Sequence, residues 1–179
     1  MKKLTLLLFL LILVSCAPYQ SNRYTVKMPN DWHILKNSKK GTLITKDGLY
    51  LQTISITERN VDNATTEGKK NIIKKNMLPN EIATALLADL ESDASLKKLG
   101  VLNNSILTIS GKKGCNISVR YTTAKGLKTR AIYYGLLDGN TFYLICYEAA
   151  ERYYFEKDLP TFENMMKTFQ LLAADKKQW

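Results

Sequence analysis

The chain has 179 residues, enough for one domain of ordinary size, and 26 basic against 16 acidic residues give it a formal net charge of +10. Three cysteines and one histidine exclude a dense disulfide framework and the paired His and Cys ligands of a common metal site. A chain of this length buries roughly two thirds of its unfolded surface, so it needs no disulfides to fold.

The first sixteen residues have the pattern of an export signal. After a Met-Lys-Lys start, every residue from 4 to 14 except Thr5 is strongly apolar. Such a run suits a secretory signal and is shorter than the roughly 20 apolar residues that cross a bilayer. It ends in the sequence LVSC at 13–16, which resembles the lipobox of bacterial lipoproteins. A membrane-spanning helix over the same run is the alternative.

That resemblance implies a signal peptide at 1–15, cleaved before Cys16, and a diacylglyceryl group on the Cys16 thiol. One acyl chain holds a protein only marginally, whereas two or three anchor it durably. Residue 17 is Ala, not the Asp that commonly retains lipoproteins in the inner membrane of Gram-negative bacteria. We therefore expect a lipid-anchored protein of the cell envelope, in the outer membrane and facing the periplasm if the host is Gram-negative.

Lysine pairs are scattered along the chain, as at Lys74-Lys75 and Lys112-Lys113. They are typical of a solvated surface, and weak attraction to anionic lipid headgroups or cell-wall polymers is the second interpretation. No nucleic-acid partner is expected, because an exported protein rarely meets nucleic acid and no recognition motif is present. The expected partners are the membrane, through the lipid anchor, and an envelope protein.

Residues 16–22 are polar and are expected to tether the lipid to a single domain at 23–174, followed by a loose tail at 175–179. Residues 59–76 predict a long polar loop with a helical stretch near 71–75. Extended segments are expected, in chain order, at 24–28, 42–46, 51–58, 105–110, 115–122, 129–137 and 141–148.

Two helices are expected, at Pro79–Ser92 and from about Pro160 to Leu172, each with a proline near its start. Their apolar stripes have the spacing of a helix packed on a sheet. The stripes are Ile82, Leu86, Leu87 and Leu90 in the first helix, and Phe162, Met165, Met166 and Phe169 in the second. Strands joined by short turns, with helices between and after them, give the α+β class, with an antiparallel sheet flanked by helices.

Two-residue turns at Lys125-Gly126 and Gly139-Asn140 are expected to join the last three strands, and the resulting register divides them into two faces. The apolar face, which should meet the core, comprises Ile117, Val119, Tyr121, Ile132, Tyr134, Leu136, Tyr143, Ile145 and Tyr147. The mixed face comprises Asn116, Ser118, Arg120, Thr122, Ala131, Tyr133, Gly135, Phe142, Leu144 and Cys146. Arg120 and Tyr133 on this mixed face form the candidate interaction surface.

Cys115 and Cys146 are expected to be buried free thiols even in an oxidising compartment. The expected register places Cys115 opposite Leu136 and Cys146 opposite Ala131. The two cysteines would then lie about 17 Å apart along the sheet and on opposite faces. A disulfide needs Cα atoms within about 7 Å.

The order of these parts resembles a known fold. The segments YTVKMPNDWHIL and RYYFEKDLPTFENMMKTF, with the helix and meander between them, are similar to the PsbP-like fold. That fold is shared by the photosystem II subunit P, a Ran-binding nuclear transport factor and small bacterial lipoproteins of unassigned function. The resemblance implies an α/β/α sandwich in which Pro29, Trp32, Phe162 and Phe169 are packing positions. It also implies a non-enzymatic role, by analogy of fold alone.

Groups suited to catalysis are few. His33 lies at a strand start, where a turn or surface position is the usual interpretation, and no nucleophile motif, metal-ligand spacing or phosphate-binding glycine loop accompanies it. No cofactor and no metal are therefore expected. The carboxylates near Glu148 leave open a hydrolase site with two facing carboxylates, a ligand groove, or a packed corner between strand and helix. These carboxylates are Glu148, Glu151, Glu156 and Asp158.

The favoured function is a non-catalytic accessory or binding protein of the cell envelope. The alternatives are a carrier of a small or lipid-like ligand and an envelope hydrolase that uses carboxylates near Glu148. A cavity lined by Tyr133, Phe142 and Leu144 would favour the carrier, and convergent buried carboxylates near Glu148 would favour the hydrolase. A sheet with a covered core and no pocket would favour the accessory role.

Overall fold

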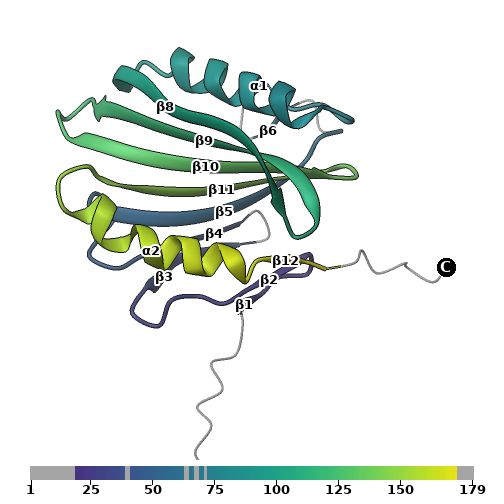
Figure 1. Ribbon diagram of the computed structural model, residues 1–179, viewed down its shortest axis with the longest axis horizontal. Coiled ribbons are helices and arrows are strands. Elements are labelled where there is room, and N and C mark those ends of the chain that lie inside the picture. Colours follow the sequence, from purple (N-terminus) through teal and green to yellow (C-terminus); the bar gives the residue numbers. More distant parts are fainter. Residues whose placement is uncertain (1–18, 39–40, 63–64, 67–68, 71, 173–179) are drawn as a thin grey trace, which may run out of the picture.

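The computed structural model describes residues 19–172 except 39–40, 63–64, 67–68 and 71 (Figure 1). Cys16, the expected signal peptide at 1–15 and the expected tail at 175–179 lie outside the described residues. No helix in the described ranges is long and apolar enough to cross a membrane.

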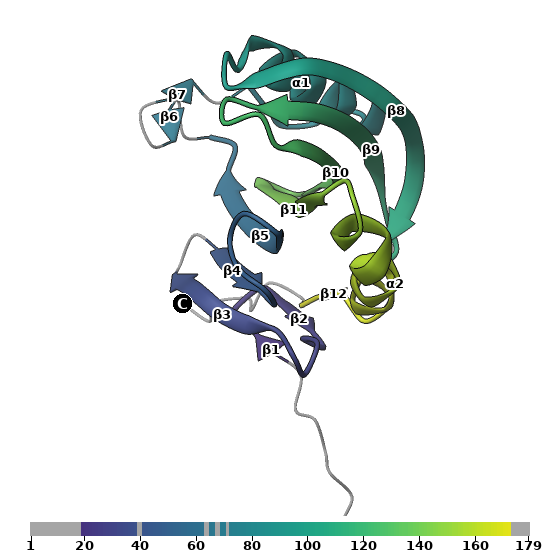
Figure 2. The same ribbon diagram turned by 90° about the vertical axis from the view of Figure 1, so that its left-hand side faces the viewer.

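The fold is built on a seven-stranded antiparallel sheet with the order β3-β4-β5-β11-β10-β9-β8. Helix α1 lies against β8, β9 and β10 on one face, and α2 lies against β11 and β5 on the other (Figure 2). The expected α+β class, with an antiparallel sheet between helices, is confirmed. The strands of the sheet are β3 (His33–Ser38), β4 (Gly41–Thr45), β5 (Gln52–Asn60), β8 (Leu96–Ile109), β9 (Lys112–Thr123), β10 (Lys128–Asp138) and β11 (Thr141–Ala150), and the helices are α1 (Pro79–Ser92) and α2 (Tyr154–Lys167).

Two smaller sheets complete the fold. β2 (Tyr24–Val26) lies between β1 (Tyr19–Gln20) and β12 (Gln170–Leu171), and so joins the start of the described chain to the segment after α2. β6 (Thr65–Thr66) pairs with β7 (Lys69–Lys70) inside the segment expected to be a loop. β1 shows that residues 19–20 of the segment expected to be a tether at 16–22 belong to the folded domain.

The sheet has a separate hydrophobic core on each face, because successive side chains of a strand alternate between faces. The core under α2 includes Ile132, Leu136 and Tyr147, packed with Phe155 and Phe162 of the helix. The core under α1 contains Cys115, Ile117, Val119, Tyr121, Ala131, Phe142 and Cys146. The expected single apolar face is therefore wrong: its β9 residues and its β10 residues lie on opposite faces.

The error arises in the β9–β10 turn. Three residues lie between Thr123 and Leu127, whose backbones are hydrogen-bonded (Thr123 N to Leu127 O, 2.9 Å), and Gly126 has a φ of 85°. A three-residue turn with a left-handed glycine shifts the register by one residue relative to a two-residue turn. A one-residue shift moves every β9 side chain to the other face. The two-residue turn at Gly139-Asn140 is confirmed by the pairing of Asp138 with Thr141.

The expected boundaries hold for α1 and fail for three other elements. α2 begins at Tyr154 instead of Pro160, so the proline lies inside the helix, and the end of the expected helix is β12. β8 begins at Leu96, nine residues before the expected strand, and it is a mostly exposed edge strand whose two bulges interrupt the alternation of a regular strand. The described residues near 71–75 are not helical.

Both described cysteines are buried and free, which confirms the expectation. The expected geometry was wrong, however. Cys115 lies opposite Gly135 and Cys146 opposite Tyr133, so both thiols belong to the core under α1. Strand β10 lies between their strands, and two strand spacings of about 4.8 Å already exceed the reach of a disulfide.

Candidate functional site

The two residues of the expected interaction surface lie on opposite faces of the sheet. Arg120 is exposed on the face that carries α2 and pairs with Arg130 across the β9–β10 ladder. Tyr133 lies on the other face, packed against the core under α1, and burial raises the pKa of its phenol. The structure therefore does not bring Arg120 and Tyr133 together into one surface.

Glu148 belongs to a small polar group in the core under α1. The Tyr121 hydroxyl donates to its carboxylate, and burial raises the pKa of Glu148 above its ordinary value. Tyr133 donates to the Cys146 thiol, whose pKa burial raises well above its ordinary value. A thiol with a raised pKa stays protonated and is a poor nucleophile.

The other carboxylates expected near Glu148 lie elsewhere. Asp158 is buried on α2, on the opposite face of the sheet, where Gln52 donates to it at 3.0 Å and Lys46 lies 3.6 Å away. Glu156 is also on α2 and forms an ion pair with Arg130. Glu151 lies in the turn between β11 and α2. The sheet separates Glu148 from Glu156 and Asp158, so Glu148 does not face either of them across one substrate site.

The structure also places His33, the only histidine of the sequence, and the residues predicted to line a carrier cavity. His33 is exposed at the start of the edge strand β3, opposite Thr45. Among the described residues, no group of three or more His, Cys, Asp or Glu side chains could hold a metal ion. The candidate carrier residues Tyr133, Phe142 and Leu144 pack in the core under α1 and line neither of the two hollows described below.

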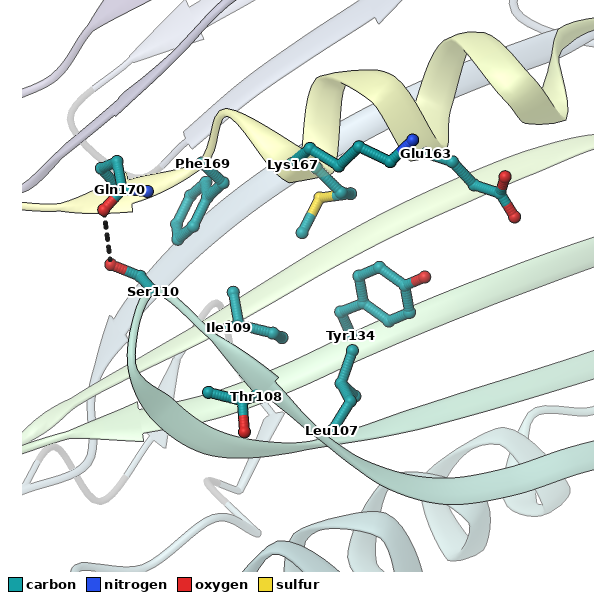
Figure 3. Close-up of a pocket in the computed structure, with 10 residues that line it drawn as sticks. Leu107, Thr108, Ile109, Ser110, Tyr134, Glu163, Lys167, Phe169 and Gln170 are labelled. Carbon is teal, nitrogen blue, oxygen red and sulfur yellow. Dashed lines mark hydrogen bonds between the residues drawn. The ribbon is translucent and has the colours of Figure 1, made fainter.

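A groove of about 380 Å³ lies between α2 and the end of β8 (Figure 3). Its apolar surface comes from Leu107, Ile109, Tyr134, Met166 and Phe169. Hydrogen bonds join the two sides of its polar rim: Ser110, after β8, donates to Gln170 of β12 and accepts from the backbone N–H of Leu171 at 2.8 Å. The groove offers contact area for an apolar group and no nucleophile with an adjacent base.

A second hollow, of about 530 Å³, lies where three connections meet at one end of the sheet. These connections are the β4–β5, β9–β10 and β11–α2 turns, on the left in Figure 1. Backbone hydrogen bonds join them: Ala150 N to Leu51 O at 2.8 Å and Glu151 N to Lys128 O at 2.9 Å. The three segments thus form a single surface, although they are far apart in sequence.

This end of the sheet exposes four large apolar or aromatic side chains, which we call the apolar loop cluster. Their exposed fractions are 56% for Leu49, 72% for Tyr50, 37% for Leu127 and 65% for Tyr153. Basic side chains outnumber acidic ones here. Lys125 lies 4.7 Å from the centre of the Tyr50 ring, and Lys128 and Arg152 line the hollow together with one acid, Glu151. Exposed apolar side chains with a polar rim are typical of a site that binds another molecule.

Tyr153 is held in an unusual backbone conformation. Its φ is 79° and its ψ is −58°, and Tyr154 N donates to Arg152 O at 3.1 Å across it. This is a γ-turn, which is strained for a residue with a side chain. Strained conformations of this kind concentrate at functional sites. The strain and the exposure of the ring both single out this cluster.

Sequence reasoning missed the apolar loop cluster. The local signal was weak but present, since Leu49-Tyr50 and Leu127 directly follow turn glycines, Gly48 and Gly126. The convergence of these apolar residues depends on the strand order of the sheet, which the sequence does not display.

No protein-family model matches the chain, and no curated protein matches it. Solved structures match its fold. The solution structure of cyanobacterial PsbP (CyanoP) from Synechocystis sp. PCC 6803 has a TM-score of 0.58 at 9% identity, over 87% of this chain and 92% of that chain. LpqN of Mycobacterium tuberculosis, described as involved in cell envelope biogenesis, has a TM-score of 0.56 at 12% identity, over 89% and 86%.

The Ran-binding protein Mog1p of Saccharomyces cerevisiae has a TM-score of 0.53 at 10% identity, over 83% of this chain and 89% of that chain. A crystal structure from Bacteroides thetaiotaomicron matches with a TM-score of 0.52 at 10% identity, over 87% of this chain. This chain covers only 47% of the length of that protein. At these identities the similarity shows the fold alone, and the fold is PsbP/Mog1-like.

Proposed function

We propose that this protein is a lipid-anchored accessory protein of the cell envelope and that it binds a protein partner through the apolar loop cluster. The observation that carries the proposal is the exposure of Leu49, Tyr50, Leu127 and Tyr153 on the three connections that meet at the second hollow, which Leu127 lines. Tyrosine and arginine are enriched in protein interfaces, and exposed tyrosines supply much of the binding energy there. The basic rim favours a partner whose apolar anchor is flanked by acidic residues.

The comparisons agree with this class of function without establishing it. One protein of the same fold is described as involved in cell envelope biogenesis, and another is a Ran-binding protein. The separation of Glu148 from Asp158 by the sheet argues against the hydrolase. The groove beside α2 keeps the carrier alternative open, because an apolar ligand could occupy it.

The test is photo-crosslinking from native membranes with a probe at position 127, in the otherwise unchanged chain and in the double variant Leu49→Ser, Tyr50→Ser. An anchor residue of an interface contributes about 2 kcal/mol or more, so the double variant should recover at least tenfold less of the partner. Its melting temperature should stay nearly unchanged, since substitutions at exposed positions usually cost less than about 0.5 kcal/mol.

The matched control is Val101→Ser with Ile106→Ser on β8, where the exposed fractions are 47% and 58%. This control should recover the partner normally. Equal recovery by both double variants would contradict the proposed surface. Turnover of an envelope substrate by the protein, abolished by Glu148→Gln, would contradict the accessory role itself.

A further inference from the structure

The described chain starts against one edge of the large sheet. The Tyr19 hydroxyl donates to Asn37 Oδ1 of β3 at 2.7 Å and accepts from Thr42 Oγ1 of β4 at 2.8 Å. Its ring packs against Tyr24 of β2, with the centroids 6.1 Å apart. Residue 19 is therefore fixed beside the β3 edge, and both views show β1 next to β3 (Figures 1 and 2).

This edge carries exposed apolar side chains. All residues from His33 to Asn37 are exposed, and the fractions for Ile34 and Leu35 are 51% and 49%. Neighbouring residues of a regular strand point to opposite faces. A register shift between Ile34 and Lys36 makes Leu35 an additional, bulged residue. The bulge leaves two consecutive large apolar side chains in contact with solvent.

The charges around this edge favour an anionic partner. Lys36 is exposed next to Leu35, and Lys27 is exposed on the connection between β2 and β3. The nearby acid Asp31 is paired with Lys46. Lysines flanking exposed apolar side chains suit the surface of a bilayer, where the apolar groups enter the headgroup region and the lysines meet lipid phosphates.

The short distance along the chain between Cys16 and Tyr19 limits which surface of the protein can lie against the bilayer. Only three peptide units separate Cys16 from Tyr19, so their Cα atoms lie within about 11 Å of each other. The opposite edge of the sheet, β8, is six strand spacings from β3, roughly 29 Å. A lipid on Cys16 therefore holds the β3 edge at the membrane and leaves β8 and α1 far from it.

We propose that the β3 edge, with Ile34 and Leu35 at its centre, rests on the anionic surface of the membrane that holds the lipid anchor. The inference rests on the proposed anchoring at Cys16. It adds an orientation: the strands run alongside the membrane, α1 points away from it, and the apolar loop cluster faces sideways toward a neighbouring protein.

The test places an environment-sensitive dye on Leu35→Cys in the full, processed protein, reconstituted into vesicles of phosphatidylethanolamine and phosphatidylglycerol. Cys115 and Cys146 are buried and should not react under native conditions. The dye emission should shift to the blue and should be largely quenched when the lipid tails carry nitroxides. The matched control is Ile106→Cys on β8, which is exposed to 58% on the opposite edge and should show neither effect.

Each other outcome overturns the inference in a recognisable way. A dye at position 35 that stays in water, on protein that still floats with the vesicles and carries labelled palmitate, contradicts the orientation and spares the anchor. Palmitate missing from Cys16 removes the anchor and with it the orientation. A blue shift that nitroxide lipids do not quench shows that a second copy covers the edge.

The role of charge is tested by Lys36→Glu. This variant should lower the quenching in the vesicles that contain phosphatidylglycerol and leave it unchanged in vesicles of phosphatidylcholine alone. Equal quenching of the variant and the original protein in the first vesicles contradicts the role of charge.

Discussion

At the scale of single residues, Glu148 is a carboxylic acid whose burial opposes its ionisation. Its carboxyl group lies in the core under α1, and burial raises its pKa above the ordinary value of 4.5, although the hydroxyl of Tyr121 partly opposes this shift. An acid whose folded-state pKa is raised stabilises the fold while it is protonated. That contribution is complete below the unfolded pKa and is lost as the pH rises through the folded pKa.

Glu148→Gln should therefore stabilise the protein at neutral pH. The glutamine oxygen still accepts the Tyr121 hydrogen bond, and the amide carries no charge to bury. The melting temperature of the variant should exceed that of the original at about pH 7.5, and the difference should disappear near pH 4. Glu91→Gln on the exposed side of α1 is the control for the substitution itself, since it makes the same change outside the core. A difference independent of pH would mean that packing, not charge, separates the two proteins.

At the scale of secondary structure elements, Gly135 allows α1 to lie directly on β10. A Cβ atom at this position would lie 3.0 Å from Cys115 Sγ and 3.2 Å from side-chain atoms of both Ile82 and Leu86. These neighbours are core residues of the helix and of β9, and none of them can turn into solvent. The close approach of helix and sheet therefore depends on the missing side chain.

Gly135→Ala should lower the free energy of unfolding by about 1–3 kcal/mol, the usual cost of overpacking a core. Gly100→Ala is the matched control on β8, because its new Cβ would meet only Arg120 Cγ at 3.8 Å. It should be neutral or stabilising by up to about 1 kcal/mol, since alanine restricts the unfolded chain. Urea unfolding of both variants measures the difference. Equal stability of the two would show that α1 is packed loosely.

The elements also show what sequence alone could predict. The bounds of α1 were correct because Pro79, the carboxylate of Glu81 that accepts from Leu78 N–H at 2.7 Å, and the apolar stripe all agree. The start of α2 had no such signal, because Tyr153 caps it without a side-chain hydrogen bond and Pro160 lies inside it. The β9 register depended on one residue of a turn, and the strand order that assembles the apolar loop cluster depended on tertiary pairing.

At the scale of the whole molecule, the two surfaces proposed for binding lie in different directions. The β3 edge is the first strand of the sheet, and the apolar loop cluster lies at the ends of β4, β5, β11, β10 and β9. A membrane at the edge and a protein at the strand ends can therefore be bound at once without competing for the same residues. The orientation on the membrane requires that the chain is anchored close to Tyr19, and it therefore depends on Cys16, whereas protein binding at the apolar loop cluster does not.

Cys16→Ala should abolish labelling by palmitate in cells and leave the signal peptide uncleaved or the protein soluble. In the proposed anchoring, the Cys16 thiol receives the diacylglyceryl group and the signal peptide is cleaved directly before Cys16, so a variant without this thiol has no atom to acylate. The fold of the described residues should be unaffected, because Tyr19 is held by its pairing with β2 and by its hydrogen bond to Asn37. Cys115→Ser is the control and should keep full labelling, since that thiol is buried between the sheet and α1. Undiminished labelling of the Cys16→Ala protein would refute the lipid anchor, and with it the orientation on the membrane, while the apolar loop cluster would remain to be tested by its own crosslinks.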